Sequence, residues 1–214
     1  MVHFLLKVYN MACQHKFYSY LQLQRLTDFE PEIIIIGTFN PELPKDNYSE
    51  WFYGRTDNNY FWDLLPKMFG DEGLRNRAHT DWKKYCKRKK IALTDLLSGI
   101  NDADFTNEAH IKVLSKYTDS DLATRFKDQI PNQVIPLLQT YSSIKSVYLT
   151  TTNNSQFWEG LWRPLENYCF QSGIWCRKLM TPSKGARFFM TKNSGISMLD
   201  FIYNDWLSKW NYNR

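Results

Sequence analysis

Two asparagines stand where an amide side chain could act on a ligand. Asn40 follows a glycine turn at the end of an unbroken apolar run, and Asn59 precedes a segment rich in aromatic residues. An asparagine amide both donates and accepts hydrogen bonds, but it cannot serve as a strong base near neutral pH. A site built on these side chains would therefore act by positioning and electrostatics. Each residue also has a structural interpretation, Asn59 as a helix cap and Asn40 as part of an Asn-Pro turn.

The apolar run at residues 33–36 is β-branched throughout and has no polar face. Such a run is typical of a strand that is covered on both sides in a parallel sheet. Gly37 ends the strand, and the turn that follows lies at its carboxyl end, outside which ligands bind in open α/β sheets. We therefore expect a binding loop here. Asn59 can cap the next helix, whose apolar side includes Phe61 and Leu65.

Further apolar runs predict three more strands, and amphipathic segments separate them. The strands are expected at residues 91–94, 146–150 and 174–180, and the helices at 16–26, 81–90, around 122–126, and at 132–141, 157–165 and 194–210. This alternation predicts a three-layer α/β/α fold around a central parallel sheet of about four strands. Residues 98–118 have no clear period and are expected to form a long loop or short irregular pieces. We expect one domain over residues 1–214, with residues 1–30 as an N-terminal helical extension.

Three motifs follow one another around the first strand. They are the turn Gly37-Thr38-Phe39, an aromatic segment that ends in Tyr53-Gly54-Arg55, and Asn59-Tyr60-Phe61-Trp62. This order resembles the uracil-DNA glycosylase superfamily, most closely its hypoxanthine-DNA glycosylase-like branch. Weaker matches lie at Asp95, Asp119-Ser120-Asp121-Leu122, Pro131-Asn132, Thr181-Pro182-Ser183 and Ala186-Arg187-Phe188. The resemblance covers most of the chain and implies a uracil-DNA glycosylase-like domain.

The resemblance implies an enzyme that removes a deaminated base, uracil or hypoxanthine, from DNA by hydrolysis of the N-glycosidic bond. Such a DNA glycosylase would act in base excision repair as a monomer, without a metal or a cofactor. In the hypoxanthine-type branch the proposed catalytic asparagine occupies the position of Asn59. Other branches place a catalytic Asn or Asp in a G-x-[ND]-P pattern, which points to Asn40, although here one more residue separates it from Gly37.

The resemblance also implies that the loops after the strands hold a nucleotide flipped out of the DNA helix. Aromatic faces would stack on the base and an amide would bond to its edge, whereas the structural alternatives are core packing, favoured for Phe52, and a helix cap at Asn153. The basic turn after the fourth strand would contact phosphate, or would be a solvated turn. The substrate-binding candidates are Gly37, Thr38, Phe39, Tyr53 and Asn153, and the DNA-binding candidates are Ser183, Lys184 and Arg187.

The net charge of +5 and the pI near 8.9 suit a polyanionic partner without requiring one. Lysines and arginines cluster within residues 83–90, where a solvated helix face explains them as well as phosphate contact does. The 4 cysteines lack the spacing of a zinc or iron–sulfur site. We see no secretory signal or membrane helix and expect a cytoplasmic protein.

No strong general base stands out beside the two asparagines. The histidines lie outside the expected loops, so histidine-based acid catalysis is not favoured; they are His3, His15, His79 and His110. Two alternatives to a DNA glycosylase stay open for this reason. One is a catalytically inactive module of the same fold that binds nucleic acid or nucleotide. The other is a hydrolase that cleaves the N-glycosidic bond of a free nucleoside or nucleotide.

Overall fold

A four-stranded parallel sheet forms the centre of the computed structural model, which describes residues 12–21, 29–45, 47–116, 118–190 and 195–211. Its strands are β2 (Ile33–Gly37), β3 (Ile91–Asp95), β6 (Ser146–Leu149) and β7 (Trp175–Lys178), in the order β3-β2-β6-β7. Ile33 is in register with Ile91 on one side and Ser146 on the other. The predicted α/β class and the parallel sheet of four strands are therefore confirmed.

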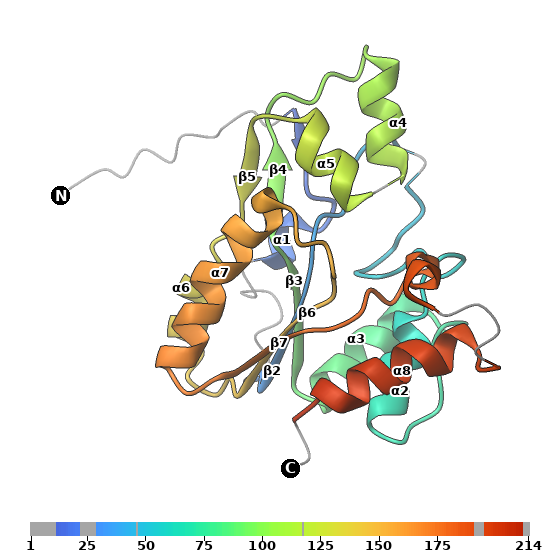
Figure 1. The fold of residues 1–214 in the computed structure, drawn as a ribbon, viewed down its shortest axis with the longest axis vertical. Coiled ribbons are helices and arrows are strands. Elements are labelled where there is room, and N and C mark those ends of the chain that lie inside the picture. Colours follow the sequence, from blue (N-terminus) through green and yellow to red (C-terminus); the bar gives the residue numbers. More distant parts are fainter. Residues whose placement is uncertain (1–11, 22–28, 46, 117, 191–194, 212–214) are drawn as a thin grey trace.

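Helices cover both faces of this sheet (Figure 1). On one face lie α2 (Phe61–Met68), α3 (His79–Arg88) and α8 (Met198–Lys209), and on the other lie α6 (Val134–Thr140) and α7 (Gln156–Gln171). Alternate residues of β2 divide between the two cores: Ile33 and Ile35 pack under α2, α3 and α8, whereas Ile34 and Ile36 pack under α6 and α7. All four are fully buried, which stabilises the fold by about 1.5–3 kcal/mol for each side chain.

A second, antiparallel sheet lies beside the first one and was not expected. It contains β1 (Cys13–Gln14), β4 (Leu97–Ile100) and β5 (Gln129–Pro131), in the order β1-β4-β5. The predicted loop at residues 98–118 is wrong, because β4 and the helix α4 (Glu108–Lys116) occupy most of it. Every residue of β4 is buried, so the strand lacks the alternation of polar and apolar residues that marks a half-exposed strand.

The N-terminal helix is shorter than predicted within the part of the chain that the structure describes. Helix α1 covers Tyr18–Leu21, and residues 22–26 of the expected helix lie outside the described residues, as do residues 1–11 of the expected extension. The segment before α1 runs as β1 alongside β4 and carries Cys13 into the core.

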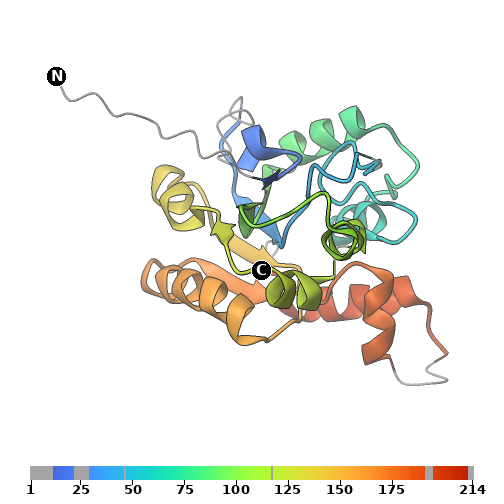
Figure 2. The same cartoon turned by 90° about the horizontal axis from the view of Figure 1, so that it is seen from above.

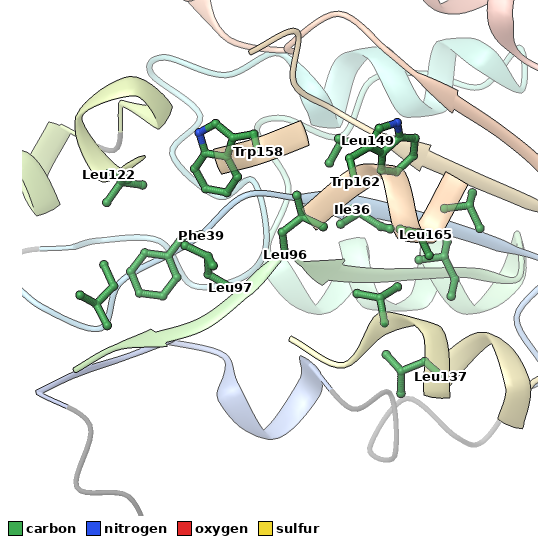
Figure 3. Packing of buried hydrophobic residues seen from close by; sticks show 14 of the residues in the cluster. Ile36, Phe39, Leu96, Leu97, Leu122, Leu137, Leu149, Trp158, Trp162 and Leu165 are labelled. Carbon is green, nitrogen blue, oxygen red and sulfur yellow. The ribbon is translucent and has the colours of Figure 1, made fainter. Parts of the chain in front are cut away.

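Two short helices extend beyond the carboxyl edge of the parallel sheet. They are α4 and α5 (Asp119–Arg125), and seen from above they lie over the middle of the molecule, between its N-terminal and C-terminal parts (Figure 2). Leu122 fixes α5 in the same apolar cluster as Phe39 and Trp158 (Figure 3). The 3-10 helix η1 (Lys184–Phe189) follows β7 at this same edge. The loops expected to form a site are thus joined there by α5 and η1.

Candidate active site

A cavity of about 600 Å³ opens at the carboxyl edge of the parallel sheet. The last residues of β2 and β3 and the loops after β2, β6 and β7 line it, together with the aromatic loop before α2, the start of α5 and part of η1. Of the predicted site residues, nine line this cavity: Gly37, Thr38, Phe39, Asn40, Tyr53, Asn59, Asn153, Ser183 and Lys184. Arg187 is not part of the lining, and its guanidinium lies 5.0 Å from the centre of the Phe188 ring.

Asn59 is fastened to the loop after β7 through its backbone. It forms an antiparallel bridge with Ser183, and the neighbouring Tyr60 amide donates to the Pro182 carbonyl at 2.7 Å. The side-chain oxygen of Asn59 accepts from the Phe61 amide at 2.8 Å, at the start of α2. The N-cap of α2 is Tyr60, so Asn59 stands one residue before the cap and its side chain bonds two residues ahead, as in an Asx turn. Asn59 also lines the cavity, with its NH2 group as the available donor.

Asn40 is held within its own loop. Its side-chain oxygen accepts from the Asn47 amide nitrogen at 2.9 Å, and the same nitrogen donates to the Pro41 carbonyl at 2.7 Å. The backbone carbonyl of Asn40 accepts from the Lys16 amide at 2.8 Å. This network supports the turn interpretation of Asn40, although the residue also lines the cavity.

The aromatic candidates are packed against other rings. Tyr53 has φ 56°, and its ring stacks on Phe61 at 3.8 Å between centroids with the planes 6° apart. Its hydroxyl lies 2.8 Å from Thr150 Oγ1. Burial, and then the nearby Asp95, hold the pKa of Tyr53 well above its usual value, so the hydroxyl remains protonated and can donate. Phe52 is buried in the core, as the sequence analysis favoured.

Asp95, the last residue of β3, has a carboxyl group in the cavity lining and a buried partner behind it. Its Oδ2 lies 2.6 Å from His15 Nε2. His15 Nδ1 accepts from the Phe17 amide at 2.9 Å, so the ring hydrogen is on Nε2 and the neutral imidazole donates to Asp95. Burial raises the pKa of Asp95, and the hydrogen bond from His15 opposes this effect. A Cβ on Gly37 would lie 2.2 Å from Asp95 Oδ1, so this position requires glycine.

His15 lies outside the loops that line the cavity, as expected, but it contacts the site through Asp95. Its side chain is completely buried and orients a carboxyl group of the cavity. The two residues are 80 positions apart, and His15 reaches Asp95 because β1 pairs with β4, the strand that follows Asp95. No local spacing in the sequence indicates this contact.

Asp119, the first residue of α5, brings a second carboxyl group to the cavity. Its Oδ1 accepts from the Thr38 hydroxyl at 2.8 Å, and its Oδ2 accepts from the Thr151 hydroxyl at 2.6 Å. Burial raises the pKa of Asp119; the two hydroxyl bonds lower it, and the charge of Asp95 adds to the increase. The sequence offered no strong general base, and the structure adds two carboxyl groups, Asp95 and Asp119, to the cavity lining. We call Asp95, Asp119 and Tyr53, with their partners His15, Thr38, Thr150 and Thr151, the buried wall. Asp95, His15, Thr150 and Thr151 are buried in it, and the other three residues are half-buried.

The other side of the cavity lining is exposed. Phe188 and Phe189 line the cavity although 79% and 54% of their surfaces are accessible, and Lys184 is exposed beside them. We call these three residues the exposed rim. Next to it, the Ser183 hydroxyl lies 3.0 Å from Thr181 Oγ1 and accepts from the Gly185 amide at 3.2 Å. The Asn153 side chain similarly accepts from the Ser155 amide at 2.9 Å, ahead of α7.

The basic cluster at residues 83–90 lies on α3 and at its end, away from the cavity. Helix α3 leads into the first residue of β3, so the end of the cluster stands at the amino edge of the sheet. Lys89 pairs with Asp71 at 2.8 Å and Lys90 with Glu32 at 2.6 Å. These ion pairs favour the solvated helix face over phosphate contact.

The described residues contain no group of three or more His, Cys, Asp or Glu side chains arranged to hold a metal ion. In the same part of the chain, none of the helices has the length and apolar character needed to cross a membrane.

Comparison with known proteins gives one informative similarity. No protein-family model matches the chain, and no curated protein matches it either. Its fold is similar to a solution NMR structure from Methanosarcina acetivorans, described as a "putative uracil DNA glycosylase". The two share 17% identity over 86% of this chain and 93% of the other, with a TM-score of 0.54. The chain therefore has an α/β fold like that of this uracil-DNA-glycosylase-like neighbour.

Proposed function

We propose that this protein is a DNA glycosylase that removes a deaminated base, uracil or hypoxanthine, by hydrolysis of the N-glycosidic bond. The observation that supports it best is the composition of one cavity: a buried carboxyl group, Asp95, and half-buried carboxyl and amide groups lie inside it, and exposed aromatic and cationic side chains lie at its rim. Its volume of about 600 Å³ is within the range of small-molecule sites and suits a nucleobase with its sugar. The fold similarity supports the same proposal.

The reaction makes specific demands on such a cavity. As the bond between C1′ and the base nitrogen breaks, its electron pair leaves with the base, and the sugar becomes oxocarbenium-like before the oxygen of water bonds to C1′. The site must therefore stabilise negative charge on the base and positive charge on the sugar. The NH2 group of Asn59 can donate to the departing base, and carboxylates can stabilise the sugar. The protonated Tyr53 hydroxyl donates to Thr150 Oγ1, whose own hydrogen goes to the Ile36 carbonyl at 3.2 Å, so Tyr53 supports the wall of the cavity rather than the base.

The exposed rim fits contact with a DNA strand. Lys184 supplies a cation for phosphate, and Arg187 supplies another next to it. The face of Phe188 is accessible, so it can stack on the base that stays in the duplex when its pairing partner is flipped out. In this proposal the rim positions the DNA while the cavity receives the extruded nucleotide.

The test is base release from oligonucleotides that contain uracil, hypoxanthine or only normal bases, in single and double strands, with alkaline cleavage of abasic sites as the readout. We expect release from one of the deaminated substrates. Asn59→Ala should lower the rate by at least about 100-fold, since positioned groups in active sites contribute on this scale. Asn101→Ala is the matched control, because Asn101 lies outside the cavity lining and bonds to Asp128.

A nucleic-acid-binding module without turnover is the second candidate. It is favoured by the hydrogen bonds that already occupy the oxygens of Asn59 and Asn40. Tight, salt-dependent binding of the oligonucleotides without base release would identify it. Release of base from free nucleosides, with no salt-dependent binding of oligonucleotides, would identify a nucleoside hydrolase instead.

A further inference from the structure

Asp119 occupies a special position in the buried wall, between two loops that come from neighbouring strands. Thr38 follows β2, Thr151 follows β6, and each donates its hydroxyl to a different oxygen of the Asp119 carboxyl group. A carboxylate has about four acceptor positions, so these two bonds leave acceptor capacity on both oxygens. Because Asp119 lines the cavity, that capacity is available to a ligand or to a water molecule inside it.

The backbone of Asp119 is also fixed. Its carbonyl accepts from the Trp158 indole nitrogen at 2.9 Å, and the side chain of Leu122, one turn further along α5, is fully buried. Figure 3 shows Leu122 and Trp158 in the same apolar cluster. A carboxyl group that is held at its backbone and at both oxygens does not need to reorganise during a reaction, which is the property expected of a preorganised catalytic group.

Asp119 shares the cavity lining with the cations Arg55, Lys116 and Lys184. Asp95 and Tyr53 interact with it electrostatically from the buried wall. Lys116, at the end of α4, lines the same cavity but is exposed. The burial of Asp119 and the proximity of Asp95 both favour the protonated form, which makes Asp119 a better proton acceptor when it is ionised.

We propose that Asp119 is a catalytic residue of the hydrolysis, and this inference rests on the proposed function. Asp119 accepts a proton from the water molecule whose oxygen bonds to C1′, while the electron pair of the breaking C1′–nitrogen bond leaves with the base. Its negative charge stabilises the sugar before the proton arrives. Asp119 then releases the proton to solvent, and the base anion takes up a proton from solvent. Asn59 binds the base rather than the water.

The competing explanation is that Asp119 only latches the two loops together. Three variants separate the explanations. Asp119→Asn removes the charge and keeps the size. Asp121→Asn makes the same change on the same helix outside the cavity lining, where the Asp121 carboxyl group accepts from the nearby Thr118 hydroxyl. The double variant Thr38→Val, Thr151→Val breaks the latch and keeps the carboxyl group.

The measurement is the single-turnover rate of base release from the best oligonucleotide substrate as a function of pH. We expect Asp119→Asn to lower the rate by about 100-fold or more and to remove the acidic limb of the pH profile. Its affinity for an oligonucleotide with a stable abasic-site analogue should stay within about threefold. Asp121→Asn should keep both the rate and the pH profile. In the double valine variant the rate should fall about tenfold, but the acidic limb should remain.

If Asp119→Asn does not fold, Asp119→Ala with added sodium formate replaces it, and formate should restore part of the rate. The inference is overturned if Asp119→Asn is as active as Asp121→Asn. It is also overturned if the rate falls as far in the double valine variant as in Asp119→Asn and the two variants have the same pH profile. Absence of formate rescue in a folded Asp119→Ala protein also counts against it. An active wild type combined with any of these results leaves the proposed function standing. An inactive wild type overturns both.

Discussion

The buried wall and the exposed rim face one cavity but differ in how their polar groups are held. In the buried wall, both oxygens of Asp119 and one oxygen of Asp95 accept hydrogen bonds from side chains of other segments. In the exposed rim, Phe188 is among the most exposed large apolar side chains of the described residues, and Lys184 is exposed beside it. The wall is rigid because its contacts are internal, whereas the rim is available to a partner.

This difference shows how the two tasks of the proposed enzyme are divided. Chemistry on the sugar requires groups whose positions do not change and whose charges are strengthened by burial. Binding of a DNA strand requires accessible rings and cations that gain their partners on association. Substitutions in the wall should therefore affect stability and turnover, and substitutions in the rim should affect binding.

The largest effect is expected from His15→Ala. This change leaves the buried Asp95 carboxyl group without its donor, which costs about 1–3 kcal/mol of the free energy of unfolding and more if the group is charged, and it also leaves a cavity where the fully buried ring packed. Urea denaturation at pH 7 measures it. His15→Gln can still donate to Asp95, so its free energy of unfolding should fall clearly less. Equal decreases in both variants would mean that packing of the ring, and not its hydrogen bond, stabilises the wall.

A second prediction concerns pH. Folding raises the pKa of both Asp95 and Asp119, so the folded state binds more protons than the unfolded chain. Their contribution to stability is complete below the unfolded pKa of about 4 and is lost as the pH rises through the folded values. Asp119→Asn removes the part of this loss that comes from Asp119. The free energy of unfolding should therefore fall less steeply with rising pH in the variant than in the wild type. Each unit of raised pKa is worth about 1.4 kcal/mol.

Urea denaturation from pH 3.5 to pH 8 gives both curves. A variant curve that is parallel to the wild-type curve throughout this range would show that Asp119 has the same pKa folded and unfolded, and would place it outside the buried wall. Asp121→Asn again serves as the control for a simple change of charge on α5.

Local patterns predicted the sheet and the cavity loops well, because both depend on neighbours in the chain. The run at residues 33–36 indicates a strand covered on both sides, and the edge of a parallel sheet brings its carboxyl-end loops together. The buried wall depends instead on contacts between distant segments. His15 reaches Asp95 across the second sheet, whose strand β4 has no alternation to mark it.

Asp119 was missed for a different reason. An acidic residue at the start of a helix is common, since it interacts favourably with the amide groups there, so Asp119 ahead of the expected helix around residues 122–126 suggested no further role. In the structure the Asp119 side chain instead accepts from Thr38 and Thr151, on loops that the sequence places far away. A local explanation can therefore hide a tertiary one.

At the rim, Phe188→Ala should weaken binding of the best oligonucleotide by about 1–3 kcal/mol, the contribution of one ring that stacks on a base. Because the side chain is 79% exposed, the melting temperature should not change. Phe170→Ala is the matched control, since Phe170 is 87% exposed at the end of α7 and does not line the cavity. Fluorescence anisotropy measures the affinity. An equal decrease of affinity in both variants would show that the exposed rim is not part of the binding surface.

The smallest effect is expected from the cations. Each phosphate contact adds about 0.9 to the slope of the logarithm of affinity against the logarithm of salt concentration for duplex DNA. Lys184→Ala should therefore reduce the slope by about this amount and lower the affinity a few-fold at 100 mM salt. Lys84→Ala, in the basic cluster of α3, should leave the slope unchanged, because that helix face lies away from the cavity. A slope that changes in Lys84→Ala and not in Lys184→Ala would show that DNA binds at α3 and not at the cavity.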